Sequence, residues 1–130
     1  MIPDNEKSWF AGRVASFRYA INGLVKILSG QHNFRIHLVV GALVVTAGLI
    51  LELPAIDWCV LILTIALVLS LEAINTALEL LVDLVAPEFN EKAGLVKDIA
   101  AGAVLISAVA AVIIGIIIFG HKFLNLFQSI

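Results

Sequence analysis

Three long apolar segments, separated by short polar stretches, constrain the fold of this chain more than any other feature. Residues 36–51 and 99–120 contain no Asp, Glu, Lys or Arg, and residues 58–71 are equally free of charge. A helix needs about 20 apolar residues to cross the hydrocarbon core of a bilayer. Hydrophobic residues make up 62% of the chain, too many for a soluble domain of this size. The sequence therefore predicts a single all-α integral membrane domain over residues 1–130, with spans at about 34–52, 56–85 and 95–121.

A helix with one apolar face is expected before the first span. Over residues from about 8 to 29, apolar side chains recur at steps of three and four, with Arg13, Arg18 and Lys26 between them. The apolar positions are Phe10, Val14, Phe17, Ile21, Leu24 and Leu28. Amphipathic basic helices of this kind lie in the membrane interface, which is the interpretation we favour. The alternative is an ordinary helix packed on the bundle.

Basic residues gather on one side of the predicted spans. Seven of the eight Lys and Arg residues precede the first span or lie in the loop after the second, and only Lys122 follows the third. The positive-inside rule makes that side the cytoplasm, so we expect a cytoplasmic N-terminus. The chain has no basic block of the kind that binds nucleic acid, and its single cysteine, Cys59, cannot form an internal disulfide.

The second apolar segment ends in a stripe of polar side chains. On a helix with 100° per residue, a sector of about 80° contains Glu72, Asn75, Glu79 and Asp83. A helix over residues 57–85 would be about 42 Å long, which exceeds the hydrocarbon core of about 30 Å, so one end must leave the membrane. Ionisable residues at this depth are functional by default. The alternative is an interhelical hydrogen-bond network that only holds the bundle together.

The charges around this stripe are typical of phosphoryl transfer. Three neighbouring carboxylates need a cation, and Mg²⁺ prefers carboxylate oxygens and is commonly shared with substrate phosphates. Lys97 and Asp98 follow across a short loop, at the start of the third span. Carboxylates, a lysine and a divalent ion are the groups that phosphoryl transfer requires. The sequence therefore predicts metal-assisted phosphoryl transfer at the inner membrane face, although no GxxxxGKS/T loop of soluble nucleotide-binding proteins is present.

Three quoted stretches carry a resemblance to a known family. "LEAINTALELLVDLV", followed after a short loop by "KDIAAGAVL" and preceded by "NFRIHL", resembles the prokaryotic diacylglycerol kinase family over most of residues 13–120. The resemblance implies three spans and an N-terminal surface helix, in a bacterial inner-membrane protein. It also implies a homotrimer with composite active sites between subunits, which phosphorylates a lipid alcohol with ATP and Mg²⁺.

The resemblance also implies roles for individual residues. Glu72 would be the general base, Asn75 would orient it or a phosphate oxygen, and Glu79 would be a metal ligand. The nucleotide contacts implied are Tyr19, Asp83, Glu88, Asn90, Lys97 and Asp98. Asn33 and Arg35, with Glu72, would contact the lipid substrate.

One position departs from the family pattern. Gln31 stands where the family usually has the acid that is the second metal ligand. Glutamine still offers a neutral carbonyl oxygen, and His32 beside it is an alternative ligand better suited to softer transition metals. The other histidines, His37 and His121, are expected at the membrane interfaces.

The identity of the lipid alcohol stays open between two substrates. "NFRIH" and "LEAINTALE" favour undecaprenol, because the diacylglycerol branch more often carries "AFRQE" and "EILNSAIE"; the alternative is a diacylglycerol kinase that makes phosphatidic acid. A more remote alternative is a non-enzymatic bundle or cation channel. A channel needs polar groups through the outer half of the membrane, where the second and third spans offer only Thr64 and Ser107.

Overall fold

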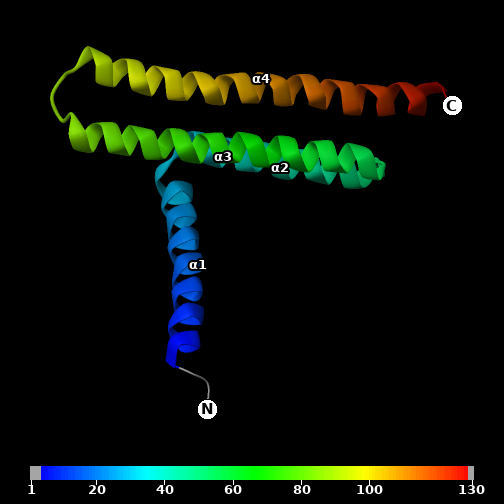
Figure 1. Ribbon diagram of the computed structural model, residues 1–130. Coiled ribbons are helices and arrows are strands. Elements are labelled where there is room, and N and C mark those ends of the chain that lie inside the picture. The colour runs from blue at the N-terminus through cyan, green and yellow to red at the C-terminus, as the bar shows by residue number, and fades with distance from the viewer. Residues whose placement is uncertain (1–3, 129–130) are drawn as a thin grey trace.

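Four helices make up the described part of the chain, and three of them run side by side. The computed structural model describes residues 4–128 and contains α1 (Asp4–Gly30), α2 (His32–Ile50), α3 (Ala55–Val85) and α4 (Glu91–Gln128). Figure 1 shows α2, α3 and α4 alongside one another, with α1 (blue) extending away from them from the start of α2. Within residues 4–128 no strand is present, and α2, α3 and α4 are long and apolar enough to cross a membrane. The predicted all-helical architecture with three candidate spans is confirmed.

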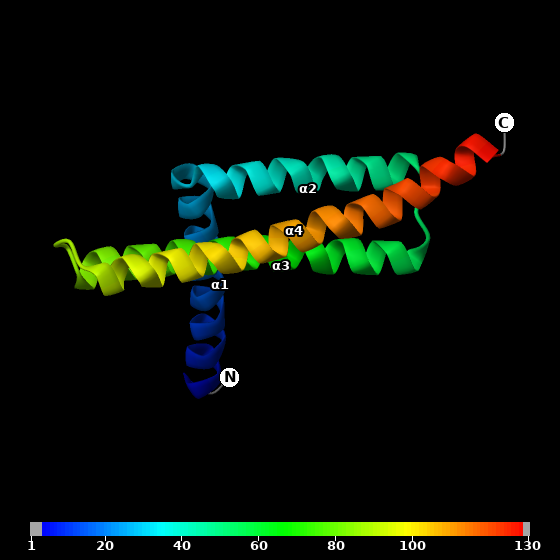
Figure 2. The ribbon, with the colours of Figure 1, turned by 90° about the horizontal axis from the view of Figure 1, so that it is seen from above.

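The helix α3 is the centre of the bundle. Seen from above in Figure 2, α4 lies over the end of α3 nearest the α3–α4 loop and crosses toward α2 at its own C-terminal end. In the most apolar 18-residue stretch of each helix, 28% of α3 is buried, compared with 17% of α2 and 17% of α4. Much apolar surface of the three helices therefore faces outward, where lipid or further protein has to cover it.

The two ends of the bundle differ in character. One end, formed by the α3–α4 loop, residues 86–90, is called the polar end below; the other is the α2–α3 turn, residues 51–54. At this turn Leu53, Leu61 and Ile118 form a small buried cluster. A Cβ on Gly48 would lie 3.0 Å from both Leu53 Cδ1 and Trp58 Cη2, so glycine permits this close approach. Lys122 Nζ donates to the Glu52 carbonyl at 3.1 Å, which ties α4 to the turn.

The N-terminal helix α1 is present and longer than the predicted range of about 8–29. Its predicted apolar face has no partner in the bundle, because Val14, Phe17 and Ile21 are all more than half exposed. A location in the membrane interface stays a prediction, as does the amphipathic character of the helix. The side chain of Phe10 lies outside the described residues.

The observed helices differ from the predicted spans mainly at their ends. Helix α2 begins and ends two residues earlier than predicted, and α4 extends beyond the predicted span of about 95–121 on both sides. Pro87 lies in the loop as expected, but Gly94 lies within the first turns of α4, where its N–H donates to the Asn90 carbonyl at 3.0 Å. A single glycine weakens a helix by only about 1 kcal/mol, and the hydrogen bonds of the first turn compensate for it.

Candidate active site

The polar stripe of α3 changes from buried to exposed along the helix. Glu72 and Asn75 are buried, with 3% and 7% of their surface exposed, Glu79 is half-buried, and Asp83 is exposed near the polar end. The stripe follows the helical repeat, because residues three or four apart lie on the same face. One edge of one helix therefore leads from the interior of the bundle to its polar surface.

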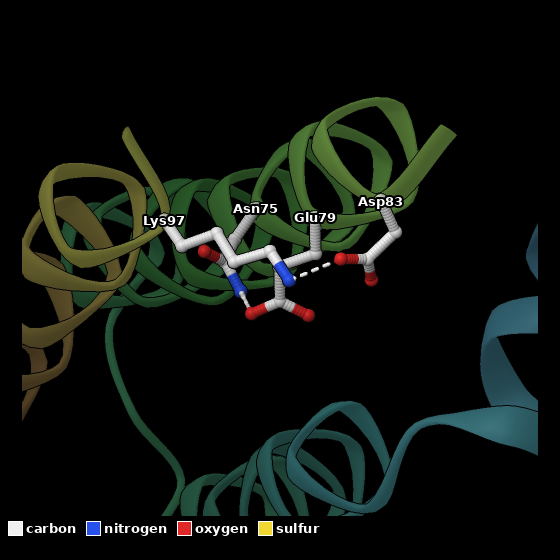
Figure 3. A network of polar contacts seen from close by, with 4 residues as sticks. All are labelled: Asn75, Glu79, Asp83 and Lys97. Carbon is white, nitrogen blue, oxygen red and sulfur yellow. Dashed lines mark hydrogen bonds and ion pairs between the residues drawn. The ribbon is translucent and has the colours of Figure 1, made fainter. Parts of the chain in front are cut away.

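Asn75 and Glu79 form the centre of this stripe. Asn75 Nδ2 donates to Glu79 Oε1 at 2.9 Å, one helical turn away. Figure 3 shows both side chains pointing away from α3, with the amide directed at the carboxylate. Asn75 Oδ1 is buried and has no hydrogen-bond partner among the described residues. A buried acceptor in this state costs about 1–3 kcal/mol, which a bound cation or donor would recover.

Lys97 reaches the stripe from the neighbouring helix. Its ammonium group forms an ion pair with Asp83 Oδ1 across the α3–α4 loop, as the dashed line in Figure 3 marks. The pair is exposed, with 36% of the Lys97 side chain and 64% of the Asp83 side chain accessible to solvent. Exposed pairs contribute about 0–1 kcal/mol to stability, so the main consequence is a positive charge held at the exposed end of the stripe, about one helical turn beyond Glu79.

These contacts suit a magnesium ion shared with phosphates. In the part of the chain that the structure describes, no group of three or more His, Cys, Asp or Glu gathers to hold a metal. Mg²⁺ usually needs only one or two protein carboxylates, because water and substrate phosphates supply its other ligands. The Glu79 carboxylate and the unpaired oxygen of Asn75 are hard oxygen donors on adjacent turns. The residues present therefore fit Mg²⁺.

The remaining predicted site residues make no hydrogen bond or ion pair with the stripe in the part of the chain that the structure describes. Gln31 is half-buried between α1 and α2, and its side chain makes no capping hydrogen bond. Further exposed candidates are Tyr19, Asn33, Arg35, Glu88 and Asp98. Tyr19 has the Arg18 guanidinium 5.7 Å from its ring centroid. Within residues 4–128 no hydrogen bond or ion pair joins any of these six residues to the stripe.

Asn90 has a structural role that sequence reasoning missed. Its Oδ1 accepts the backbone N–H of Lys92 at 2.9 Å and that of Ala93 at 3.2 Å, so it caps the N-terminus of α4. Asparagine is among the preferred residues at this position, and its place directly before Glu91 was the available signal. The cap sets where α4 begins and so positions Lys97 two turns later. The nucleotide contact proposed for Asn90 stays a prediction.

His37 is a second residue whose surroundings sequence reasoning did not anticipate. The structure places it half-buried on α2, lining a cavity of about 370 Å³ between α2, α3 and α4, and its location at the membrane interface stays a prediction. Its imidazole interacts electrostatically with the Glu72 carboxylate of α3. Only the packing of α2 against α3 brings the two together, and no local pattern reports it.

Comparison with known proteins identifies the family of this chain. The sequence model of the prokaryotic diacylglycerol kinase family matches residues 18–119. The chain is 52% identical over 103 residues to a diacylglycerol kinase of Synechocystis sp., which covers 78% of this chain but only 59% of that protein. It is 38% identical over 107 residues to an undecaprenol kinase of Bacillus subtilis, covering 82% of this chain and 87% of that protein. It is 32% identical over 109 residues to a diacylglycerol kinase of Escherichia coli, covering 84% and 89%. The family match and these names indicate a lipid kinase, and the chain belongs to the prokaryotic diacylglycerol kinase family.

Proposed function

We propose that this protein transfers the γ-phosphoryl group of ATP, with Mg²⁺, to a membrane lipid alcohol at the cytoplasmic face of the bacterial inner membrane. The observation that carries the proposal is the stripe on α3. It presents a buried carboxylate, Glu72, on the same helix face as the bonded pair Asn75 and Glu79. A positive charge from α4 stands at its exposed end.

Glu72 is the general base of the proposed reaction. Its carboxylate accepts the proton of the lipid hydroxyl as that oxygen forms a bond to the γ-phosphorus. The bond from the γ-phosphorus to the oxygen that bridges it to the β-phosphate breaks, and ADP leaves. Because Glu72 is buried, water has little access to its carboxylate. The base therefore activates the lipid hydroxyl group, and hydrolysis of ATP by water is suppressed.

The middle of the stripe would hold the metal ion and the phosphates. Glu79 and Asn75 would provide oxygen ligands, with Gln31 as a further, neutral one. A magnesium ion bound there would neutralise charge on the transferred phosphoryl group. Lys97 would donate to a phosphate oxygen, which requires that its ammonium group leave Asp83 or bind both.

We assign Tyr19, Glu88, Asn90 and Asp98 to the nucleotide site, with Asn33 and Arg35 near the lipid headgroup. Within the described residues none of them makes a hydrogen bond or ion pair with the stripe. This observation, and the outward-facing apolar surfaces of α2, α3 and α4, support a homotrimer in which a neighbouring subunit completes each site.

Undecaprenol is the substrate that we favour, with diacylglycerol as the second candidate. The names of the relatives include both activities. A cation channel is a poorer candidate, because Thr64 of α3 and Ser107 of α4, which lie deeper in these two spans, are satisfied locally. Thr64 donates to the Val60 carbonyl at 2.8 Å and Ser107 to the Val104 carbonyl at 2.7 Å. Neither of them offers a polar path through the bundle.

Replacement of Glu72 by glutamine tests the proposal. We expect Glu72→Gln to lower the Mg²⁺-dependent transfer of label from ATP into lipid by about a hundredfold to ten-thousandfold, the contribution of general base catalysis. Assembly, measured by size-exclusion chromatography in detergent, should not change. Glu91→Gln is the matched control, because Glu91 is an exposed acid at the start of α4. Full activity of Glu72→Gln would remove this residue from the base role.

A further inference from the structure

The cavity between α2, α3 and α4 is lined almost entirely by hydrocarbon. Its volume is about 370 Å³, and its polar lining side chains are His37 and Thr64. The Thr64 hydroxyl already donates to the Val60 carbonyl at 2.8 Å. The His37 imidazole makes no hydrogen bond in the part of the chain that the structure describes. His37 is therefore the one lining side chain with a polar group available to a ligand.

The register of α2 against α3 places His37 beside the proposed base. A Cβ on Gly41 would lie 3.3 Å from Ile65 Cγ2, so these two residues are level in the antiparallel pair. His37 lies about one turn from Gly41 toward the polar end, and α3 advances from Ile65 past Val68 to Glu72 in the same direction. Val68 lines the cavity, and Glu72, four residues later, lies on the same face of α3. The apolar cavity therefore ends at a pair of polar groups, one imidazole and one carboxylate.

We propose that His37 binds the hydroxyl group of the lipid alcohol, and that the cavity below it holds the hydrocarbon next to that group. This inference rests on the proposed kinase function and adds a residue to it. A hydroxyl group has one donor and two acceptor lone pairs. Glu72 accepts its proton, and an imidazole N–H donates to one lone pair, so the other lone pair stays free to attack the γ-phosphorus.

The lining also indicates a class of alcohol. In a diacylglycerol, the carbon next to the CH₂OH group carries an ester, whose carbonyl oxygen would lose its water hydrogen bonds inside this cavity. In a polyprenol, the atoms next to the CH₂OH group are hydrocarbon. An unsatisfied buried acceptor costs enough to give a preference of roughly five- to hundredfold in kcat/KM for the polyprenol. The geometry therefore favours a polyprenol as substrate.

Steady-state kinetics with two alcohols test the role of His37. We would measure the purified protein in mixed micelles with MgATP and either undecaprenol or dioleoylglycerol. His37→Ala should lower kcat/KM for undecaprenol about tenfold, as expected for a lost hydrogen bond, mainly by raising the lipid KM. The KM for ATP should not change, and His37→Gln should recover part of the loss because its amide N–H can donate. His121→Ala, at an exposed position of α4, is the matched control and should not change any constant.

A matched pair of substitutions on α4 tests the cavity. Ala111 lines it, whereas the neighbouring Ala110 is exposed and does not. Ala111→Leu should raise the lipid KM several-fold by filling the space, and Ala110→Leu should not. If Ala111→Leu instead changed the oligomeric state and left the lipid KM unaltered, a second copy of the chain would occupy the cavity and the proposal would be wrong.

The outcomes separate this inference from the kinase function. An active wild type whose lipid KM and kcat/KM are unaffected by His37→Ala, with helix content retained, would overturn the role of His37. A wild type that prefers dioleoylglycerol would overturn the assigned substrate class. A wild type that phosphorylates neither alcohol would refute the proposed function itself. If His37→Ala failed to fold, the lipid KM of His37→Gln and of the Ala111 variant would decide.

Discussion

Replacement of Lys97 by methionine separates a stabilising ion pair from a catalytic charge. Methionine keeps most of the aliphatic length of lysine, so the substitution removes the charge with little change in packing. The ion pair with Asp83 is 36% and 64% exposed at its two side chains. For pairs with this exposure the measured contribution is about 0.2–1 kcal/mol. The free energy of unfolding should therefore fall by no more than about 1 kcal/mol.

The expected effect on activity is much larger. If Lys97 neutralises charge on the transferred phosphoryl group, its removal resembles the loss of one group that stabilises a developing oxyanion. Such losses lower kcat by about a hundredfold to a thousandfold, or about 2.7–4 kcal/mol. The loss of transition-state stabilisation should thus exceed the loss of folding stability several-fold. A merely structural lysine would show the opposite order.

A double-mutant cycle measures both quantities. Lys97→Met, Asp83→Asn and the double variant would be unfolded by SDS titration in mixed micelles, and their kcat values would be measured in parallel. We expect a coupling energy in stability of at most about 1 kcal/mol, and a low kcat only where Lys97 is absent. Lys92→Met, an exposed lysine on the same helix, is the control. The reasoning is refuted by a coupling energy above about 2 kcal/mol or by a near-normal kcat for Lys97→Met.

Two further predictions concern the residues that flank the stripe. Gln31→Glu should lower the Mg²⁺ concentration needed for half-maximal activity by roughly tenfold, the size of effect that changes near a metal site commonly have on metal affinity. Ser29→Glu adds the same charge nearby and is the control. An equal effect of Ser29→Glu would argue against Gln31 as a ligand. Asn90→Ala should lower the free energy of unfolding by about 1 kcal/mol through the lost cap, measured by SDS titration, whereas Asn90→Asp keeps the acceptor and should not. If Asn90→Asp nevertheless raises the KM for ATP, the amide N–H contacts the nucleotide; an unchanged KM would leave Asn90 as a cap alone.

The candidate spans could be predicted because charge-free segments of this length have few alternatives. Their ends were less predictable, since they depend on single side chains. The third span was predicted from about residue 95, whereas the Asn90 cap begins α4 at Glu91. Its predicted end was about residue 121, but α4 continues past Gly120, because one glycine costs too little to end a helix of this length.

In the candidate site, contacts within one helix could be predicted from the sequence, whereas contacts between helices could not. The alignment of Glu72, Asn75 and Glu79 follows from the helical repeat alone, and the bond between the last two is an i, i+4 contact. The pairing of Lys97 with Asp83 spans the α3–α4 loop, and the approach of His37 to Glu72 depends on the register of α2 against α3. Neither register nor interhelical distance is encoded in a periodic pattern, so both contacts required the structure.

The stripe changes from buried at Glu72 to exposed at Asp83, and this change matches the order of the proposed roles along α3. In the proposed reaction a lipid alcohol would reach the site from the membrane and ATP would reach it from water, so the two substrates would have to meet at a boundary. Glu72, at the buried end, lies where a hydroxyl group attached to a hydrocarbon chain can reach it, and Asp83, at the exposed end, lies where a charged nucleotide can. The rise of about 1.5 Å per residue separates them by about 16 Å, with Asn75 and Glu79 between. In the proposed reaction the metal and the transferred phosphoryl group would therefore lie between the two substrates, which would explain why one helix carries both the proposed base and the proposed metal ligands.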